Sequence, residues 1–131
     1  MLDINYNGVT LAYVGDAVLE LAVREALITS GVTDTGRLSA AAQKLVCAPA
    51  QSDAVECLLP LLTPEEDAAY KLGRNHRISG KPKHASVSQY SRATGFEAVF
   101  GYLHLTNQTE RIRTLFQAVY AEKLSESKDK I

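Results

Sequence analysis

The chain has 131 residues, of which 46% are hydrophobic and 22% charged, a composition typical of one globular domain and not of a disordered chain. Charged residues interrupt its apolar stretches well before 18 residues, and Asp3 and Asn5 stand where a signal peptide would be basic and apolar. We therefore expect neither a membrane span nor export. A cytoplasmic protein is expected, in which the two cysteines, Cys47 and Cys57, are buried and reduced.

The net charge of −1 hides a strongly basic segment. No acidic residue lies between Asp67 and Glu97, and this interval has a charge of +6, contributed by Lys71, Arg74, Arg77, Lys81, Lys83 and Arg92. The rest of the chain, with 8 basic and 15 acidic residues, has a charge of −7. This asymmetry indicates a localised polyanion-binding site, and a solvated loop with chance clustering of charge is the alternative.

The first half of the chain has helical periodicity throughout. Thr10 is a suitable cap for a first helix over about 10–30, which Gly31 ends. A second helix is expected from Asp34 or Thr35 to residue 45, and a third over 50–59, ended by Pro60.

The second half begins with a strong helix-start signal, Thr63-Pro64-Glu65-Glu66, for a helix to about residue 75. The segment 78–85 is expected to be a loop. Ser86 or Ser88 begins a helix to residue 105, and Asn107, with Glu110 three residues later, begins a last helix to Leu124. No alternation of period two is present. We therefore predict an all-α, compact helical bundle with one domain over 1–124 and a flexible tail at 125–131.

One acid in the first helix requires an explanation. Asp16 follows Gly15 in TLAYVGDAVLELAVREALI, and helical spacing places apolar residues near its side, so we expect it to be buried. An isolated buried carboxylate costs several kcal/mol, roughly, unless a cation or hydrogen bonds compensate. An Asp16–Glu20–Arg24 ladder at i+4 spacing is one explanation, and it suits Glu20 better than Asp16.

A second helix has a similar acid. In SQYSRATGFEAVFGYLHL, Ala93, Glu97 and Gly101 form a small–acid–small row, which permits close approach of another helix. Packing this row against Gly15 would bring Glu97 within a few ångströms of Asp16. Two carboxylates at that distance repel each other unless they share a proton or a divalent cation such as Mg²⁺ or Mn²⁺. Together with the basic segment, the pair indicates a phosphodiesterase.

Three motifs resemble those of the Mini-ribonuclease III family, the small bacterial relatives of ribonuclease III that lack a double-stranded-RNA-binding domain. YVGDAVLEL resembles the family's Y-[IL]-G-D-A-V segment, and RATGFEAVFGYLHL its T-A-x-E-A-L-I-G-Y segment. GRNHRISGKPKHASVSQY resembles the family's G-R-N-x-x-S-G-x-x-P-K loop and the start of the helix after it. The similarity extends from about Leu11 to about Phe116.

The resemblance implies a fold like the ribonuclease III endonuclease domain and a homodimer that cleaves double-stranded or structured RNA with Mg²⁺, or Mn²⁺ in its place. It further implies maturation of 23S, large-subunit ribosomal RNA precursors. Asp16 and Glu97 match the family's catalytic, metal-binding acids. The larger ribonuclease III has further acids where this chain has Ala12 and Thr94, and the Mini family lacks them as well. Glu20 is either an outer group of the metal site or the partner of Arg24.

The candidate RNA contacts lie in and beside the basic segment, because duplex RNA is recognised mainly through phosphates and 2′-hydroxyls. They are Arg74, Asn75, Arg77, Lys81, Lys83, His84, Gln89 and Arg92. His76 is either an RNA contact or a solvent-exposed residue. His104 shares the Glu97 face and is either packed or hydrogen-bonded near the acids.

Two other functions stay open. A catalytically silent RNA-binding member of the same fold would keep the glycines, but it has no reason to keep both acids. A helical protein–protein adaptor would use the basic loop for an acidic partner. A phosphohydrolase of the HD type is excluded, because the chain contains no His-Asp dipeptide.

Overall fold

The structure is a computed structural model that describes residues 6–76 and 84–131. Over these residues the chain forms α-helices, one short 3₁₀ turn and no strand. The elements are α1 (Gly8–Ile28), α2 (Thr35–Val46), α3 (Ala48–Leu58), η1 (Leu59–Leu61), α4 (Pro64–Arg74), α5 (Val87–Leu105) and α6 (Thr109–Lys130). The predicted all-α class is confirmed.

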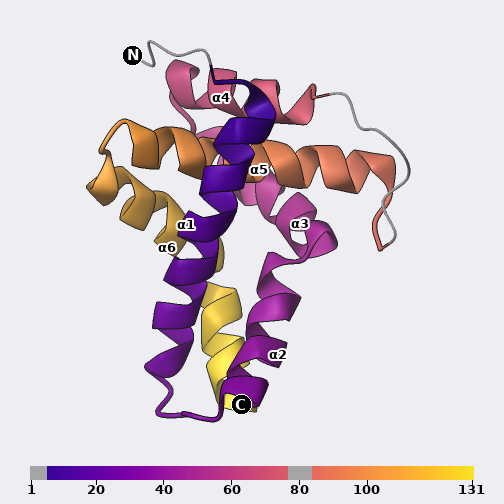
Figure 1. Ribbon diagram of the computed structural model, residues 1–131. Coiled ribbons are helices and arrows are strands. Elements are labelled where there is room, and N and C mark those ends of the chain that lie inside the picture. Colours follow the sequence, from indigo (N-terminus) through magenta and orange to yellow (C-terminus); the bar gives the residue numbers. More distant parts are fainter. Residues whose placement is uncertain (1–5, 77–83) are drawn as a thin grey trace.

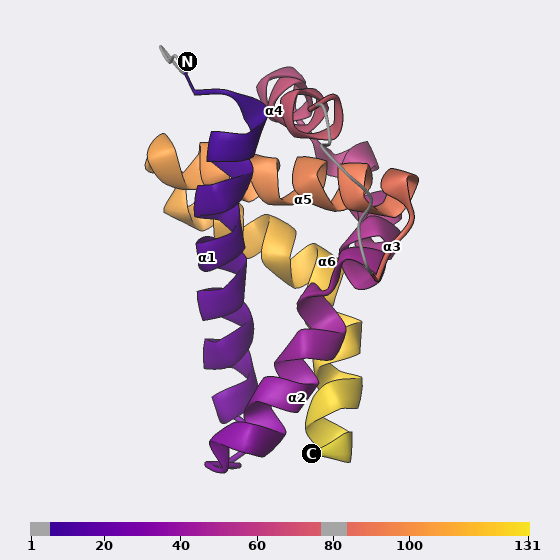
Figure 2. The ribbon, with the colours of Figure 1, turned by 45° about the vertical axis from the view of Figure 1, so that its right-hand side comes forward.

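The helix α5 lies across α1, and this crossing organises the molecule. In Figure 1, α1 runs from top to bottom, α5 crosses its upper half, and α4 lies above α5. Figure 2 shows α2 beside the lower half of α1 and the C-terminal half of α6 beside α2. The core between the helices is aromatic and aliphatic. Phe96 and Tyr120, both almost fully buried, meet edge to face with ring centroids 6.1 Å apart.

Local capping signals fix most helix starts. Thr63 and Ser86 each form a capping box, with Glu66 and Gln89 respectively, as their sequences predict for α4 and α5. The start of α1 differs from the prediction, because Asn7 is its cap. The Asn7 Oδ1 accepts a hydrogen bond from the backbone N–H of Thr10 at 2.8 Å.

The last helix also differs from the prediction at both ends. Asn107 adopts φ 58°, a left-handed conformation that asparagine tolerates, so α6 starts at Thr109 with Gln108 as its cap. The helix then continues to Lys130 and includes most of the segment 125–131 that was expected to be a tail. Two lysines in the last turn complement the helix dipole, and Ile131 packs against the core, which explains the extension.

A buried ion pair joins α4 to α6. Glu66 is 2% exposed, and its carboxylate accepts hydrogen bonds from Nε and Nη2 of Arg111 at 2.8 and 2.9 Å. Burial raises the pKa of Glu66, but the bonds from Arg111 and from the backbone N–H of Thr63 outweigh burial, so the net pKa is lowered. Glu66 therefore caps α4 and anchors α6 with one carboxylate.

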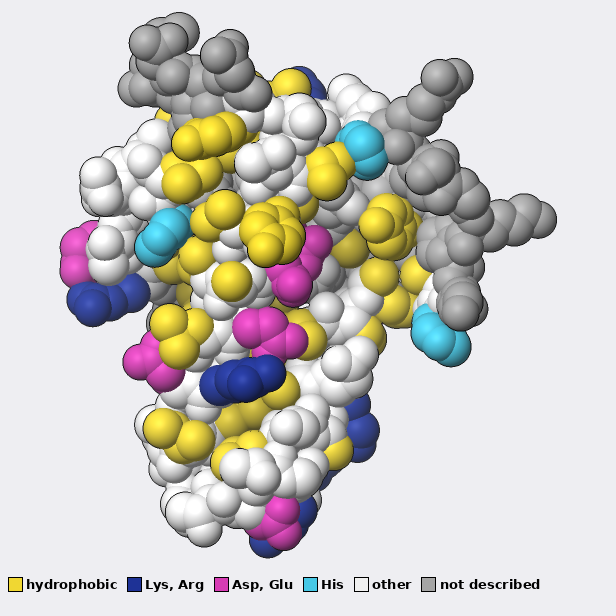
Figure 3. All heavy atoms as spheres, in the orientation of Figure 1, with side chains coloured by type: hydrophobic (Ala, Val, Ile, Leu, Met, Phe, Trp, Pro, Cys, Tyr) yellow, Lys and Arg dark blue, Asp and Glu magenta, His cyan; other side chains and the backbone are white. Residues whose placement is uncertain are grey.

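The expectation that Asp16 is buried is wrong, because α1 is buried along one stripe only. Its buried stripe includes Leu11, Gly15 and Leu19, whereas Asp16 is exposed. Tyr13 and Leu21 are 81% and 60% exposed on the opposite side of the helix. Figure 3 shows hydrophobic side chains over this face, interrupted by charged ones. Hydrophobic periodicity does not distinguish a core face from an apolar face that meets another molecule.

The cysteines are free, as expected, but Cys57 is exposed and Cys47 only partly buried. Within the described part of the chain, no helix is long and apolar enough to span a membrane.

Candidate active site

Two glycines bring α1 and α5 into backbone contact. A Cβ atom on Gly15 would lie 1.7 Å from the carbonyl oxygen of Glu97, and one on Gly101 would lie 1.8 Å from the carbonyl oxygen of Leu11. Side chains larger than hydrogen do not fit at either position. The small–acid–small row therefore packs against Gly15 as the sequence predicts.

This crossing brings the two acids together. Burial, hydrogen bonding with Asp16 and the charge of Asp16 raise the pKa of Glu97 to about 9. The charge of Glu20 also raises it, and the side chain of Gln51 lowers it. The raised pKa favours the neutral form of Glu97 near neutral pH when no cation is bound.

A small open cavity of about 230 Å³ lies over the pair. Its titratable side chains are two acids, one histidine and two tyrosines. The complete lining is Val9, Ala12, Tyr13, Asp16, His76, Tyr90, Thr94 and Glu97. Thr94 turns its hydroxyl to the carbonyl oxygen of Tyr90, at 2.9 Å. Ala12 and Thr94 stand where the larger ribonuclease III has further acids. Ala12 offers only a methyl group there, and Thr94 a hydroxyl that donates to its own helix.

The donor set fits a divalent cation. Two facing carboxylates with space for water beside them match the oxygen ligands that Mg²⁺ and Mn²⁺ prefer. A cation would also remove the repulsion that now raises the pKa of Glu97. The described residues contain no cluster of three or more acid, histidine or cysteine ligands, so a cation here would keep several waters.

Glu20 has its own partner. Arg24 Nε donates a hydrogen bond to Glu20 Oε2 at 3.3 Å, the ion pair expected from the i+4 spacing. Glu20 does not line the cavity. Its charge contributes to the raised pKa of Glu97. Of the two interpretations of Glu20, the structure favours the ion pair with Arg24.

Two of the predicted RNA contacts are used inside the fold. Arg92 Nε and Nη2 donate to the hydroxyl and carbonyl oxygens of Ser52 at 3.1 Å each, and the guanidinium also pairs with Glu56. Arg92 thus fastens α5 to α3, and we exclude it from the proposed RNA contacts. Gln89 uses its Oε1 in the cap of α5, where the N–H of Ser86 donates to it at 3.0 Å.

The other predicted contacts lie on the surface or outside the described residues. Arg74, Asn75 and His84, inside the basic segment, are exposed. Arg74 donates to Asn75 at 3.0 Å and stacks over Tyr70. Arg77, Lys81 and Lys83 lie outside the described residues.

The histidines divide between site and surface. His76 follows α4 and lines the cavity with the two acids, although sequence reasoning left its place open. His104 is exposed and does not line the cavity. The prediction that it is a packed residue on the Glu97 side of α5 is therefore wrong. Sequence reasoning assigned no role at the site to Tyr13, Tyr90 or Gln51. Tyr13 opens the YVGDAVLEL motif and lies three residues before Asp16, and both were available signals.

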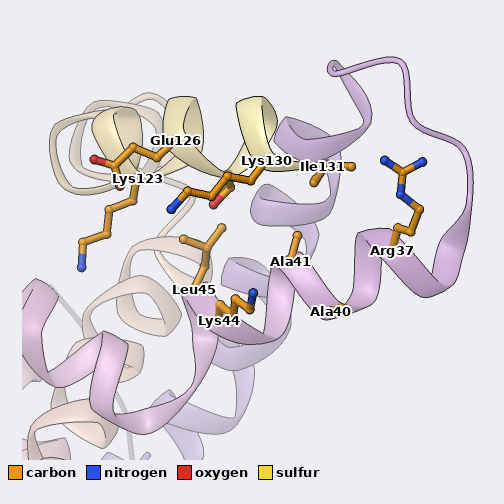
Figure 4. Close-up of a pocket in the computed structure, with 10 residues that line it drawn as sticks. Arg37, Ala40, Ala41, Lys44, Leu45, Lys123, Glu126, Lys130 and Ile131 are labelled. Atoms are coloured by element: carbon orange, nitrogen blue, oxygen red, sulfur yellow. The ribbon is translucent and has the colours of Figure 1, made fainter.

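A larger cavity, about 460 Å³, lies elsewhere, between α2 and the end of α6 (Figure 4). Its charged lining residues are Arg37, Lys44, Lys123, Glu126 and Lys130. It holds one acid and no facing carboxylate pair, so it does not match the chemistry of the Asp16–Glu97 site despite its size.

Comparisons with known proteins agree with this geometry. The Ribonuclease III domain family matches residues 9–108. Mini-ribonuclease 3 of Streptococcus pneumoniae is 43% identical over 118 residues, which cover 88% of this chain and 92% of that protein. Mini-ribonuclease 3 of Enterococcus faecalis is 44% identical over 111 residues, covering 83% and 84%.

The fold has a close counterpart among solved structures. A crystal structure of a Fusobacterium nucleatum protein superimposes with a TM-score of 0.82 at 28% identity, and the match covers 91% of this chain and 95% of the other. The family match spans both acids and the helices that carry them. The chain therefore belongs to the ribonuclease III family and is an endoribonuclease of the Mini-ribonuclease III type.

Proposed function

We propose that this endoribonuclease cleaves double-stranded RNA with a divalent cation, Mg²⁺ or Mn²⁺, held by Asp16 and Glu97. The observation that supports this most directly is the meeting of the two carboxylates where α1 crosses α5, beside an open cavity. Among the described lining residues there is no cysteine, serine or lysine, and the hydroxyl of Thr94 is bonded to the carbonyl oxygen of Tyr90. Water-derived attack on a phosphodiester therefore fits the site better than a covalent side-chain intermediate.

The two acids have different parts in the proposal. Asp16, exposed on α1, faces the side from which RNA would approach, and Glu97 holds the inner side of the pair. A bound divalent cation supplies Lewis-acid stabilisation of charge on the phosphate and the leaving oxygen. Gly15 and Gly101 keep the acids at a fixed separation, which preorganises the pair.

The RNA backbone would lie along the basic segment. Arg74, Asn75 and His84 are exposed members of this segment, and His76, also within it, lines the cavity. Lys81 and Lys83 are proposed as further phosphate contacts on sequence grounds. A chain of this size offers a small footprint, so we expect RNA binding to weaken strongly with salt.

The active form is proposed to be a homodimer. Val9, Tyr13, Leu21 and Ile28 are exposed at helical spacing along α1, and the exposed Tyr6 precedes the helix. Such an apolar stripe beside a site is typical of an interface between protein chains. A second copy would also double the number of phosphate contacts available to one duplex.

The physiological substrate is proposed to be a 23S ribosomal RNA precursor, and the expected location is the cytoplasm. Both are what the resemblance to the Mini-ribonuclease III family implies. A catalytically silent RNA-binding member of the fold is the competing function, and a cleavage assay separates the two.

The test compares wild type with Asp16→Asn on a long imperfect RNA duplex in the presence of Mg²⁺. We expect wild type to cut the duplex, and the variant to bind it without cutting. Asp129→Asn, an exposed acid near the end of α6, is the matched control and should cut like wild type. A wild type that binds but never cuts would favour the silent member, and normal cutting by Asp16→Asn would refute the assignment of the site.

A further inference from the structure

One buried amide near the site lacks a partner. Gln51, in the first half of α3, is 2% exposed, and its Nε2 has no hydrogen-bond acceptor among the described residues. A buried amide donor without a partner costs about 1–3 kcal/mol, and an aliphatic side chain of similar length would fill the volume without that cost. The presence of glutamine at this position therefore requires an explanation.

The side chain of Gln51 interacts with the carboxyl group of Glu97. Gln51 lies close enough to Glu97 to lower its pKa by side-chain hydrogen bonding, in opposition to burial and Asp16. Yet Nε2 completes no hydrogen bond of acceptable geometry. The amide thus stands beside Glu97 with unused donor capacity.

The fold holds this amide in place through its neighbour. Ser52, the next residue, accepts two hydrogen bonds from Arg92, at 3.1 Å each, through its hydroxyl and its carbonyl oxygen. Glu56, one turn later on α3, pairs with the same guanidinium. Arg92 precedes Glu97 on α5, so these contacts fix the start of α3 against the helix that carries the catalytic acid.

We infer that Gln51 is a positioning residue, whose amide N–H group donates to the carboxylate of Glu97 and orients it toward Asp16 for a divalent cation. The inference rests on the proposed function, since it requires the cation site. Hydrogen-bond partners behind metal ligands typically change metal affinity by 10–100-fold when they are removed.

The test measures Mn²⁺ affinity and stability separately. Gln51→Met keeps the length of the side chain and removes the donor, and Gln117→Met, at an exposed position on α6, is the control for the substitution itself. We expect Gln51→Met to bind Mn²⁺ at least about 10-fold more weakly, as measured by electron paramagnetic resonance of the free ion. Its urea midpoint without a cation should equal or exceed that of wild type, because the unpaired buried donor is gone.

Opposite results separate the alternatives. Unchanged Mn²⁺ affinity in Gln51→Met, with or without a lower urea midpoint, would overturn the inference and leave Gln51 as a packing residue. Asp16→Asn should lose Mn²⁺ binding in the same assay. If Asp16→Asn binds like wild type, or wild type does not bind, the cation site itself fails and the inference fails with it.

A measurement on the wild-type side chain covers the case in which Gln51→Met does not fold. The side-chain NH₂ resonances of Gln51, assigned by selective labelling, should shift when Mg²⁺ is added to wild type and should stay in place in Asp16→Asn. Resonances that do not respond to Mg²⁺ in wild type would contradict the proposed bond to Glu97.

Discussion

The backbone contact between α1 and α5 predicts that Gly15→Ala separates the two acids and destabilises the fold. In an open helix, alanine would be more favourable than glycine by about 1 kcal/mol. Here the added Cβ would lie 1.7 Å from the carbonyl oxygen of Glu97, about 1.7 Å short of the 3.4 Å at which ordinary contact begins. The atoms that this Cβ would meet belong to the backbone of α5, so no flexible side chain can move aside to make room.

The helices must therefore move apart or bend. Overpacking of a well-packed core costs about 1–3 kcal/mol, occasionally more, and backbone displacement over a whole crossing belongs at the upper end. We expect Gly15→Ala to lower the free energy of unfolding by about 3 kcal/mol, net of the helix-propensity gain. Gly101→Ala, whose Cβ would lie 1.8 Å from the carbonyl oxygen of Leu11, should behave in the same way.

Urea unfolding followed by far-ultraviolet circular dichroism measures this loss, at equal protomer concentrations because the proposed dimer would make the apparent stability depend on concentration. Gly36→Ala in α2 is the matched control, since its Cβ would lie 3.3 Å from a side-chain oxygen of Asp34, and it should change stability by less than about 1 kcal/mol. If Gly15→Ala unfolds at the same midpoint as wild type, the close crossing, and the placement of the acids that depends on it, is wrong.

Three further outcomes are expected. Glu66→Gln should lower the free energy of unfolding at pH 7 by about 2 kcal/mol, since it removes the carboxylate that pairs with Arg111, and urea titration measures this. Because the folded-state pKa of Glu66 is lowered, its stabilisation is present above pH 4.5 and is lost as the pH falls through the folded value. The two proteins should therefore converge in stability as the pH falls from 4.5 through the folded-state pKa, and a constant difference would contradict the pairing. Leu21→Arg should shift the protein from dimer to monomer in analytical ultracentrifugation, and an unchanged mass would remove the α1 stripe from the interface. Replacing Lys81 and Lys83 with alanine should weaken RNA binding for all sequences and flatten its salt dependence, and an unchanged salt slope would place RNA elsewhere.

The features that sequence predicts well here are local or periodic. The capping boxes of Thr63 and Ser86 depend on residues three apart, so their signals are complete within a short stretch. The meeting of Asp16 and Glu97 is a long-range contact, yet it was predictable because small residues flank each acid and mark where two helices can touch.

The features that sequence predicts poorly depend on which helix covers which face. Arg92 has the charge and position of an RNA contact, but its partners, Ser52 and Glu56, are 40 and 36 residues away on α3. Gln51 carries no local signal, because its importance arises from the packing of α3 against Glu97. The exposure of Asp16 was missed because an apolar interface face has the same periodicity as a core face.

The central claim is that Asp16 and Glu97 act as one unit, and a double-mutant cycle on the single-turnover cleavage rate tests it most directly. Asp16→Asn and Glu97→Gln should each lower the rate at least about 1,000-fold, which corresponds to about 4 kcal/mol of lost transition-state stabilisation. The double variant should be no slower than either single variant, because removal of one acid already disables the pair. Losses that multiply in the double variant would mean that the two carboxylates act independently, and would contradict a shared cation site.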